Sequence, residues 1–188
     1  YINPLVSVFL GVVFLGERLS RAQLVAFLLA VSGVLVLTLS YGRFPWVSIA
    51  LAFSFGIYGL VKKTNRINAV VSLLIELVLL VPAAAVYLAV VHRSGAGAFG
   101  GDNAVVTGLL AGAGVVTVTP LLLFGAGARR IPLHRVGFLQ YIAPSLMLTI
   151  GTVIYNEPFT IAHLVSFGLI WTALAVYTVT LVRSRGAR

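Results

Sequence analysis

The chain has 188 residues, of which 60% are hydrophobic and 9% are charged, and its formal net charge is +9. Soluble domains contain about 25% charged residues, so this chain lacks the polar surface of a water-soluble fold and is predicted to lie in a membrane. The absence of cysteine excludes disulfides, thiolate catalysis and cysteine-ligated metals.

Seven apolar runs follow one another along the chain. They cover residues 1–15, 22–41, 44–61, 67–91, 104–128, 136–155 and 161–182. A membrane-spanning helix needs about 20 mostly apolar residues, so the sequence predicts an all-α integral membrane protein with six full spans and a partial first one. By comparison with its repeat later in the chain, the first helix is expected to begin about five residues before Tyr1, which would make the chain a fragment.

The basic residues lie in several short gaps between the apolar runs. A nucleic-acid-binding protein would instead group them in one basic patch on its surface, so the pattern argues against nucleic-acid binding. We take the gaps alternately as inside and outside, starting with 16–21 as inside. Of the 13 basic residues, only Arg43 and Arg93 then lie outside. Because Lys and Arg concentrate in cytoplasmic loops, the C-terminus is predicted to be cytoplasmic.

The beginning of the chain is repeated near its end. A shift of 140 residues aligns the two copies without a gap, and the matched pairs include Tyr1/Tyr141, Pro4/Pro144, Gly11/Gly151 and Glu17/Glu157. The turn 16–21 contains two arginines and its counterpart 156–161 contains none, so the two copies are predicted to lie antiparallel in the membrane. Inverted repeats place a substrate site near the bilayer midplane, which indicates a transporter.

Several of these residues resemble a known family. Tyr-Ile-Asn-Pro-Leu at 1–5 and Phe-Leu-Gly-Glu-Arg-Leu at 14–19 resemble the end of the first half of an EamA-type permease of the drug/metabolite transporter superfamily. The stretches 121–133 and 137–144, together with Glu76, are similar to the RarD subgroup, whose members are named for chloramphenicol sensitivity.

The resemblance implies a bacterial inner-membrane protein of ten helices in two inverted five-helix halves (5+5) around a central cavity, with both termini cytoplasmic. On that scheme residues 1–41 are the end of the first repeat, with part of helix 4 and all of helix 5. Residues 42–188 are the second repeat, with helices 6 to 10, and helices 1 to 3 are missing. Such carriers are secondary transporters, and the chain has no phosphate-binding Gly-x-x-x-x-Gly-Lys-(Ser/Thr) motif.

Glu76 is the acidic residue that lies within a predicted span, about 13 Å from its start at 1.5 Å per residue. A carboxylate at this depth costs about 2.5 kcal/mol or more, so it is expected to face the bundle interior or water. We predict that Glu76 couples protons or contacts a cationic or polar substrate. The alternative is a structural hydrogen bond, for example with Ser72 one turn away.

A polar stripe follows one face of the 136–155 helix. Its members lie within an arc of about 80° or beside it, and they are Gln140, Tyr141, Ser145, Thr149 and Thr152. Because the first copy is mostly apolar at these places, the stripe is predicted to line the cavity. The alternatives are hydrogen bonds between helices and hydrogen bonds to the helix's own backbone. Ser54 and Tyr58 could also meet the cavity, or they could serve packing, with Tyr58 as an interfacial anchor.

Pro4, Pro120 and Pro144 lie inside spans and are hinge candidates, because proline removes a helical hydrogen bond. Pro144 would free the carbonyl of Gln140. The alternative is that packing satisfies the freed groups without any motion.

Glu17 and Glu157 lie at the ends of spans and are expected to meet free backbone amides at a turn or helix start. His92, His134 and His163 lie in loops or at a span end, without partners at ligand spacing, so no metal site is predicted.

The leading prediction is a secondary permease or exporter that moves small organic solutes, such as amino acids, metabolites or chloramphenicol-like drugs, by alternating access. The alternative is a non-transporting remnant or scaffold derived from such a carrier. We predict no enzyme, no cofactor and no nucleic-acid partner. The expected partners are the lipid bilayer, a small-molecule solute and, as a candidate, protons. The sequence leaves open the substrate, the transport direction, the coupling ion and the oligomeric state.

Overall fold

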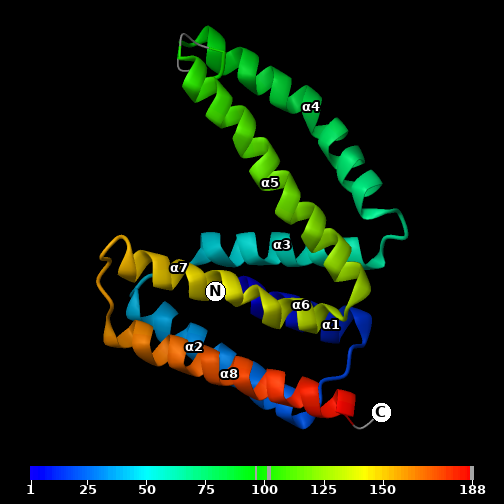
Figure 1. Cartoon of the computed structure of the whole chain (residues 1–188), viewed down its shortest axis with the longest axis vertical. Helices are drawn as coiled ribbons and strands as arrows, with labels where there is room; N and C mark the ends of the chain where they lie inside the picture. The colour runs from blue at the N-terminus through cyan, green and yellow to red at the C-terminus, as the bar shows by residue number, and fades with distance from the viewer. Residues whose placement is uncertain (96, 101–102, 187–188) are drawn as a thin grey trace. The chain divides into compact units, whose positions relative to one another are not determined.

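The computed structural model describes residues 1–95, 97–100 and 103–186, and these residues form helices and no strand (Figure 1). The helices are α1 (Ile2–Leu15), α2 (Arg21–Ser40), α3 (Trp46–Thr64), α4 (Ala69–Arg93), α5 (Ala104–Arg130), α6 (Leu133–Gln140), α7 (Ile142–Val153) and α8 (Ile161–Gly186).

Most of these helices have the length and composition of membrane spans. Within the described residues, α2, α3, α4, α5 and α8 each qualify, as does the continuous stretch Leu133–Val153 that contains α6 and α7. The shorter α1 is also apolar. The predicted all-α membrane fold is thereby confirmed: the chain is a multi-pass membrane protein. One expectation was wrong, because the run 136–155 is two helices rather than one.

Local sequence signals set several helix ends. Gly16 adopts φ 64°, a left-handed conformation open to glycine, and it ends α1. Ser20 then starts α2 with a capping box: its hydroxyl accepts the N–H of Gln23, whose side chain accepts the Ser20 N–H in return. The carboxamide oxygen of Asn68 accepts the N–H of Val70 at the start of α4.

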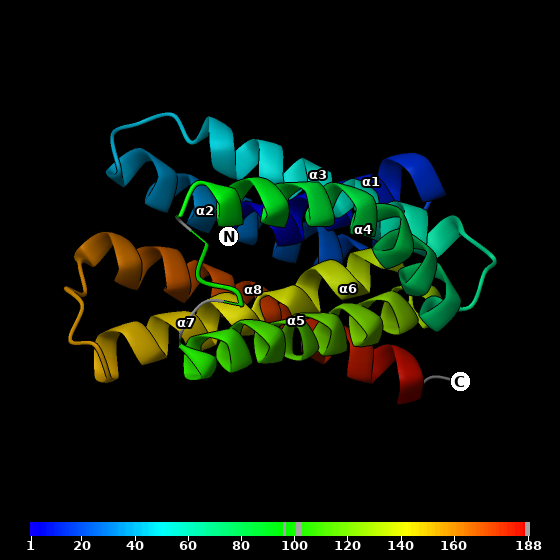
Figure 2. The same cartoon turned by 90° about the horizontal axis from the view of Figure 1, so that it is seen from above.

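The described residues form two compact units. One contains Tyr1–Lys63 and Ile131–Arg188, and the other contains Thr64–Arg130. The second unit is a helical hairpin of α4 and α5 (Figures 1 and 2). In the first unit α2 packs along α8, and α1 packs along α6.

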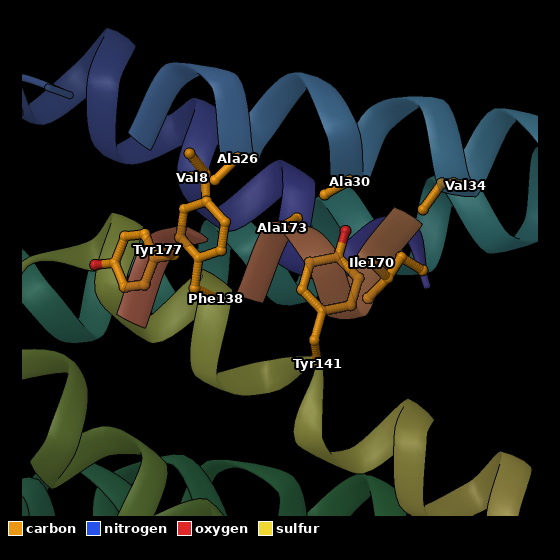
Figure 3. Packing of buried hydrophobic residues seen from close by; sticks show 9 residues of the cluster. All are labelled: Val8, Ala26, Ala30, Val34, Phe138, Tyr141, Ile170, Ala173 and Tyr177. Carbon is orange, nitrogen blue, oxygen red and sulfur yellow. The ribbon is translucent and has the colours of Figure 1, made fainter. Parts of the chain in front are cut away.

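The core of the first unit lies among α1, α2, α6 and α8. Its buried side chains are Val8, Ala26, Ala30, Val34, Phe138, Tyr141, Ile170, Ala173 and Tyr177 (Figure 3). The rings of Phe138 and Tyr177 stack with their centroids 4.0 Å apart. Small residues let α2 and α8 approach closely: a Cβ added to Gly33 would lie 2.7 Å from the backbone oxygen of Ser166. The Ser166 hydroxyl donates to the Gly33 carbonyl at 2.6 Å, a type of contact that joins helices in lipid.

The duplication is visible in this packing. We call residues related by the 140-residue shift twins. Helices α2 and α8 bury the twin pairs Ala26/Ser166, Ala30/Ile170, Gly33/Ala173 and Leu37/Tyr177. Figure 3 shows Ala26, Ala30 and Val34 following one direction while Tyr177, Ala173 and Ile170 follow it in reverse numerical order, so the two helices are antiparallel. Each helix therefore presents the same face to its own twin, as an inverted repeat requires.

Candidate functional site

A partly buried polar cluster of Asn3, Ser7 and Gln140 joins α1 to the end of α6. The Gln140 carboxamide oxygen accepts hydrogen bonds from the Asn3 side chain at 3.2 Å and from the Ser7 hydroxyl at 3.3 Å. The Gln140 Nε2 and Asn3 Oδ1 atoms are buried and have no hydrogen-bond partner among the described residues. A buried amide without partners is costly, so this pair offers one donor and one acceptor to a further polar group.

This cluster contains one predicted site residue and two that the sequence analysis missed. Gln140 was expected beside the polar stripe, whereas Asn3 and Ser7 come from the first copy, on another face of the partial helix. The available signal was an amide and a hydroxyl four residues apart, and so on one helix face, within an apolar run.

The chain bends next to this cluster, at Tyr141. Helix α6 ends at Gln140 and α7 begins at Ile142 (Figure 3). Pro144 has no N–H to donate to the Gln140 carbonyl, so the α-helical hydrogen-bond ladder is interrupted at this point. The Tyr141 N–H instead donates to the Phe138 carbonyl at 3.2 Å. The interruption expected from Pro144 is present, while its role as a hinge stays a prediction.

Tyr141 lies in the core of the first unit. Its side chain is 1% exposed and projects between α2 and α8, beside Ala30 and Ile170 (Figure 3). Its hydroxyl has no hydrogen-bond partner among the described residues.

The hydroxyls of the stripe bond mainly to their own helix. Ser145 donates to the Tyr141 carbonyl at 2.9 Å, Thr149 to the Ser145 carbonyl at 3.0 Å, and Thr152 to the Leu148 carbonyl at 2.8 Å. Ser145 also accepts the indole N–H of Trp171 in α8 at 3.0 Å. The sequence analysis named such bonds, to the helix's own backbone and between helices, as alternatives to lining a cavity. That these hydroxyls line a cavity stays a prediction.

Glu76 lies in the second unit, in α4. The Ser72 hydroxyl donates to a Glu76 carboxyl oxygen at 3.1 Å, which is the structural contact expected one turn away. Proton coupling by Glu76 stays a prediction. Pro120 lies within α5 of the same unit.

The remaining candidates lie in the first unit. Pro4 is the third residue of α1, and first-turn N–H groups have no partner within a helix. Ser54 is exposed on α3. The Lys62 ammonium lies 5.1 Å from the centre of the Tyr58 ring, which is a cation–π contact at the basic end of α3. This position matches the role of interfacial anchor that was the alternative to a place in the cavity for Tyr58.

A second polar contact lies at the other end of α6. The Glu17 carboxylate accepts the backbone N–H groups of Leu133 at 2.6 Å and His134 at 2.8 Å, and it lies 2.7 Å from the His134 Nδ1 atom. The predicted contact with free helix-start amides is confirmed for Glu17. His134 was expected in a loop, but it lies in the first turn of α6 and is 6% exposed.

The environment of Glu17 favours the carboxylate. Burial alone would raise the pKa of Glu17, but the backbone hydrogen bonds from His134 and Leu133 and the His134 ring together lower the pKa below its ordinary value. The carboxylate also faces the positive end of the α6 dipole. Glu17 therefore stays ionised and holds the end of α1 against the start of α6.

A cavity of about 320 Å³ lies at the opposite end of α1. The start of α1, the end of α2 and the start of α3 surround it, and its lining includes Tyr1, Ile2, Thr38, Tyr41, Arg43 and Ser48. None of these residues was among the predicted site residues.

The chain is similar to several known bacterial proteins. It is 46% identical over all 188 residues to the "Uncharacterized transporter YojE" of Bacillus subtilis, covering 62% of that protein. It is 43% identical over 177 residues, 94% of the chain, to "Protein RarD" of Escherichia coli, covering 60% of that protein. It is also 28% identical over 177 residues, 93% of the chain, to the "Chloramphenicol-sensitive protein RarD" of Pseudomonas aeruginosa, covering 58% of that protein.

No family model and no solved structure matches the chain. The chain spans about three fifths of the length of the curated relatives that it matches. The aligned region nevertheless covers the whole chain in the comparison with YojE and 94% of it in the comparison with RarD. These similarities confirm the resemblance to RarD proteins inferred from the sequence.

Proposed function

We propose that the full-length protein is a secondary transporter that moves small organic solutes across the bacterial inner membrane by alternating access. The observation that carries the proposal is the antiparallel packing of twin helices α2 and α8 through equivalent faces. Inverted repeats of this kind let one bundle rock against the other around a site near the midplane. The transporter names of the relatives support the same function.

The polar cluster is our candidate for the solute contact. Gln140 offers a hydrogen-bond donor and Asn3 an acceptor, and both atoms are buried without a partner among the described residues. This combination suits an amide, a hydroxyl or an amino acid, because such groups supply both an acceptor and a donor. We propose Tyr141, Ser145, Thr149, Thr152, Ser54 and Tyr58 as further residues of the pathway, and Pro4, Pro120 and Pro144 as its hinges.

Contacts at the ends of helices support the proposed orientation. Glu17 binds Leu133, and the Lys63 ammonium donates to the Ile131 carbonyl at 2.6 Å. Both contacts join gaps that the charge pattern assigns to the same, cytoplasmic face. Together with the charge pattern, these contacts support our proposal of a cytoplasmic C-terminus. We also propose, from the family resemblance, that the repeats meet between residues 41 and 42.

The test is transport by the full-length protein reconstituted in vesicles, with a panel of amino acids, metabolites and chloramphenicol, with and without a proton gradient. We expect saturable movement of at least one solute class. If none of them moves in either direction, the carrier proposal is wrong, and the alternative of a non-transporting scaffold is favoured.

A further inference from the structure

The two glutamate turns have the same geometry. Gly16 and its twin Asn156 both adopt left-handed backbone angles, with φ of 64° and 51°. The next residue then donates its N–H backwards: Glu17 to the Gly11 carbonyl at 3.1 Å, and Glu157 to the Gly151 carbonyl at 3.0 Å.

The glutamate side chains repeat this similarity. A Cβ added to Gly11 would lie 2.7 Å from a Glu17 carboxylate oxygen, and a Cβ added to Gly151 would lie 2.6 Å from a Glu157 carboxylate oxygen. Each carboxylate therefore folds back over the glycine of the preceding helix and occupies the space that a side chain at that glycine would fill.

The two carboxylates differ in what they bind. Glu17 caps α6 through the N–H groups of Leu133 and His134. Glu157 is exposed, and no described residue donates a hydrogen bond to its carboxylate. The two turns thus have the same geometry, but only the Glu17 carboxylate binds helix-start amides among the described residues.

The inverted repeat specifies what should fill the open position. Leu133 and His134 lie eight and seven residues before Tyr141, and Tyr141 is the twin of Tyr1. The twins of the capped amides therefore lie eight and seven residues before Tyr1. The Tyr1 ring packs edge-on against Phe167 with the ring centroids 5.3 Å apart, so the start of α1 lies against the first part of α8, the helix that follows Glu157.

The packing of α1 gives a second, independent indication. Gly137 of α6 packs against Pro4 and Val8 of α1, with a virtual Cβ at 2.7 Å from the Pro4 carbonyl oxygen and 2.8 Å from the Val8 side chain. The twins of Pro4 and Val8 are Pro144 and Leu148, which are only partly buried on α7. The twin of Gly137 lies four residues before Tyr1.

We propose that Glu157 caps the start of a helix that begins about eight residues upstream of Tyr1 in the full-length protein and continues into α1. This segment packs along Pro144 and Leu148 and repeats, at the opposite membrane face, the contact that Glu17 makes with α6. The relatives are long enough for such a segment, since the chain spans 62% of YojE. The proposal does not depend on which solute is carried, or on whether any is.

Hydrogen exchange of the full-length protein in vesicles tests the cap. In the wild type, the amides eight and seven residues before Tyr1 should be protected. Glu157→Ala should speed their exchange about tenfold, as the loss of a helix cap does. The matched control is Glu17→Ala, which should deprotect Leu133 and His134 and leave the upstream amides unchanged. Unchanged upstream exchange in Glu157→Ala would overturn the proposal.

A cross-link tests the packing without touching Glu157. In a cysteine-free background, Met147→Cys is paired with a cysteine directly before Tyr1, and Ser7→Cys with Gln140→Cys serves as the twin control, because the Ser7 and Gln140 side chains are in contact. We expect a short bifunctional thiol reagent to cross-link both pairs. A cross-link in the control alone would show that the upstream segment does not lie on α7, and the proposal would fail whatever the protein transports.

Discussion

The Glu17 carboxylate lies 2.7 Å from the ring of His134, although 117 positions separate the two residues in the chain. This contact joins the turn after α1 to the start of α6. Glu17 lies in the turn between α1 and α2, outside the membrane spans, and its pKa is lowered. The contact therefore supplies the first testable prediction.

Glu17 should make the stability of the protein depend on pH in the acid range. Its folded pKa lies below the ordinary value of 4.5. The carboxylate thus contributes its full stability above that value, and the contribution is lost as pH falls through the lower folded pKa. We expect Glu17→Gln to lower stability by about 1–3 kcal/mol at pH 7 and to flatten the acid limb. Thermal unfolding in detergent between pH 3 and 7 measures both effects, and an unchanged acid limb would contradict the assignment.

The close approach of α2 and α8 should make Gly33 sensitive to a single methyl group. In Gly33→Ala the new Cβ would lie 2.7 Å from the Ser166 backbone oxygen, which cannot move aside as a flexible side chain can. We expect a loss of about 1–3 kcal/mol. Gly168→Ala is the matched control in α8, because nothing lies within 4 Å of its added Cβ. Equal stability of the two variants would argue against the observed helix pair.

Replacement of Gln140 should impair transport more than replacement of an ordinary helix hydroxyl. Gln140→Leu removes the acceptor of Asn3 and Ser7 and the free donor in the cluster. We expect transport by the full-length protein to fall about tenfold or more, since a lost buried hydrogen bond costs about 1–3 kcal/mol. Thr172→Val is the control, because this exposed hydroxyl bonds the Gly168 carbonyl of its own helix. Wild-type transport by Gln140→Leu would remove the cluster from the pathway.

Glu76→Gln should remove the pH dependence of transport if Glu76 couples protons. The amide can still accept the hydrogen bond that Ser72 donates, so the local structure of α4 is kept while the titratable group is lost. We expect solute movement that no longer responds to a proton gradient. Ser72→Ala checks the structural alternative: if Glu76→Gln retains both transport and its pH dependence while Ser72→Ala impairs transport, Glu76 is a structural residue.

Labelling of single cysteines in intact cells tests the topology. Cysteines in place of Arg18 and Arg135 should react with an impermeant reagent from one face only, and a cysteine in place of Asn156 from the other. The bond between Glu17 and Leu133 requires the first two positions to share a face. Labelling of Arg18→Cys and Asn156→Cys from the same face would end the inverted-repeat interpretation.

The spans could be predicted from the sequence because each is a local property of about 20 residues. The predicted runs and the observed helices agree closely, apart from the break at Tyr141. Pro144 removes a hydrogen bond there, but Pro82 and Pro120 lie inside the unbroken helices α4 and α5, so a proline alone did not predict the break. The partner of Glu17 could be predicted as a kind of group, a helix-start amide. It could not be identified as Leu133, because a contact across 116 positions depends on how the helices pack.

The candidate site was harder to predict for the same reason. Angular position on a helix places Thr149 and Thr152 on one face, but it does not reveal that their hydroxyls bond their own backbone. Asn3 and Ser7 were missed because their importance comes from Gln140, which lies more than 130 residues away in the chain.

The face shared by α2 and α8 has a consequence for the origin of the fold. Twin positions such as Ala30 and Ile170 meet across it, so the surface is complementary to an upside-down copy of itself. An ancestor encoded as a single copy would have had to insert in the bilayer in both orientations and form a homodimer through this surface. Gene fusion then made that pairing permanent and freed the two halves to acquire different residues.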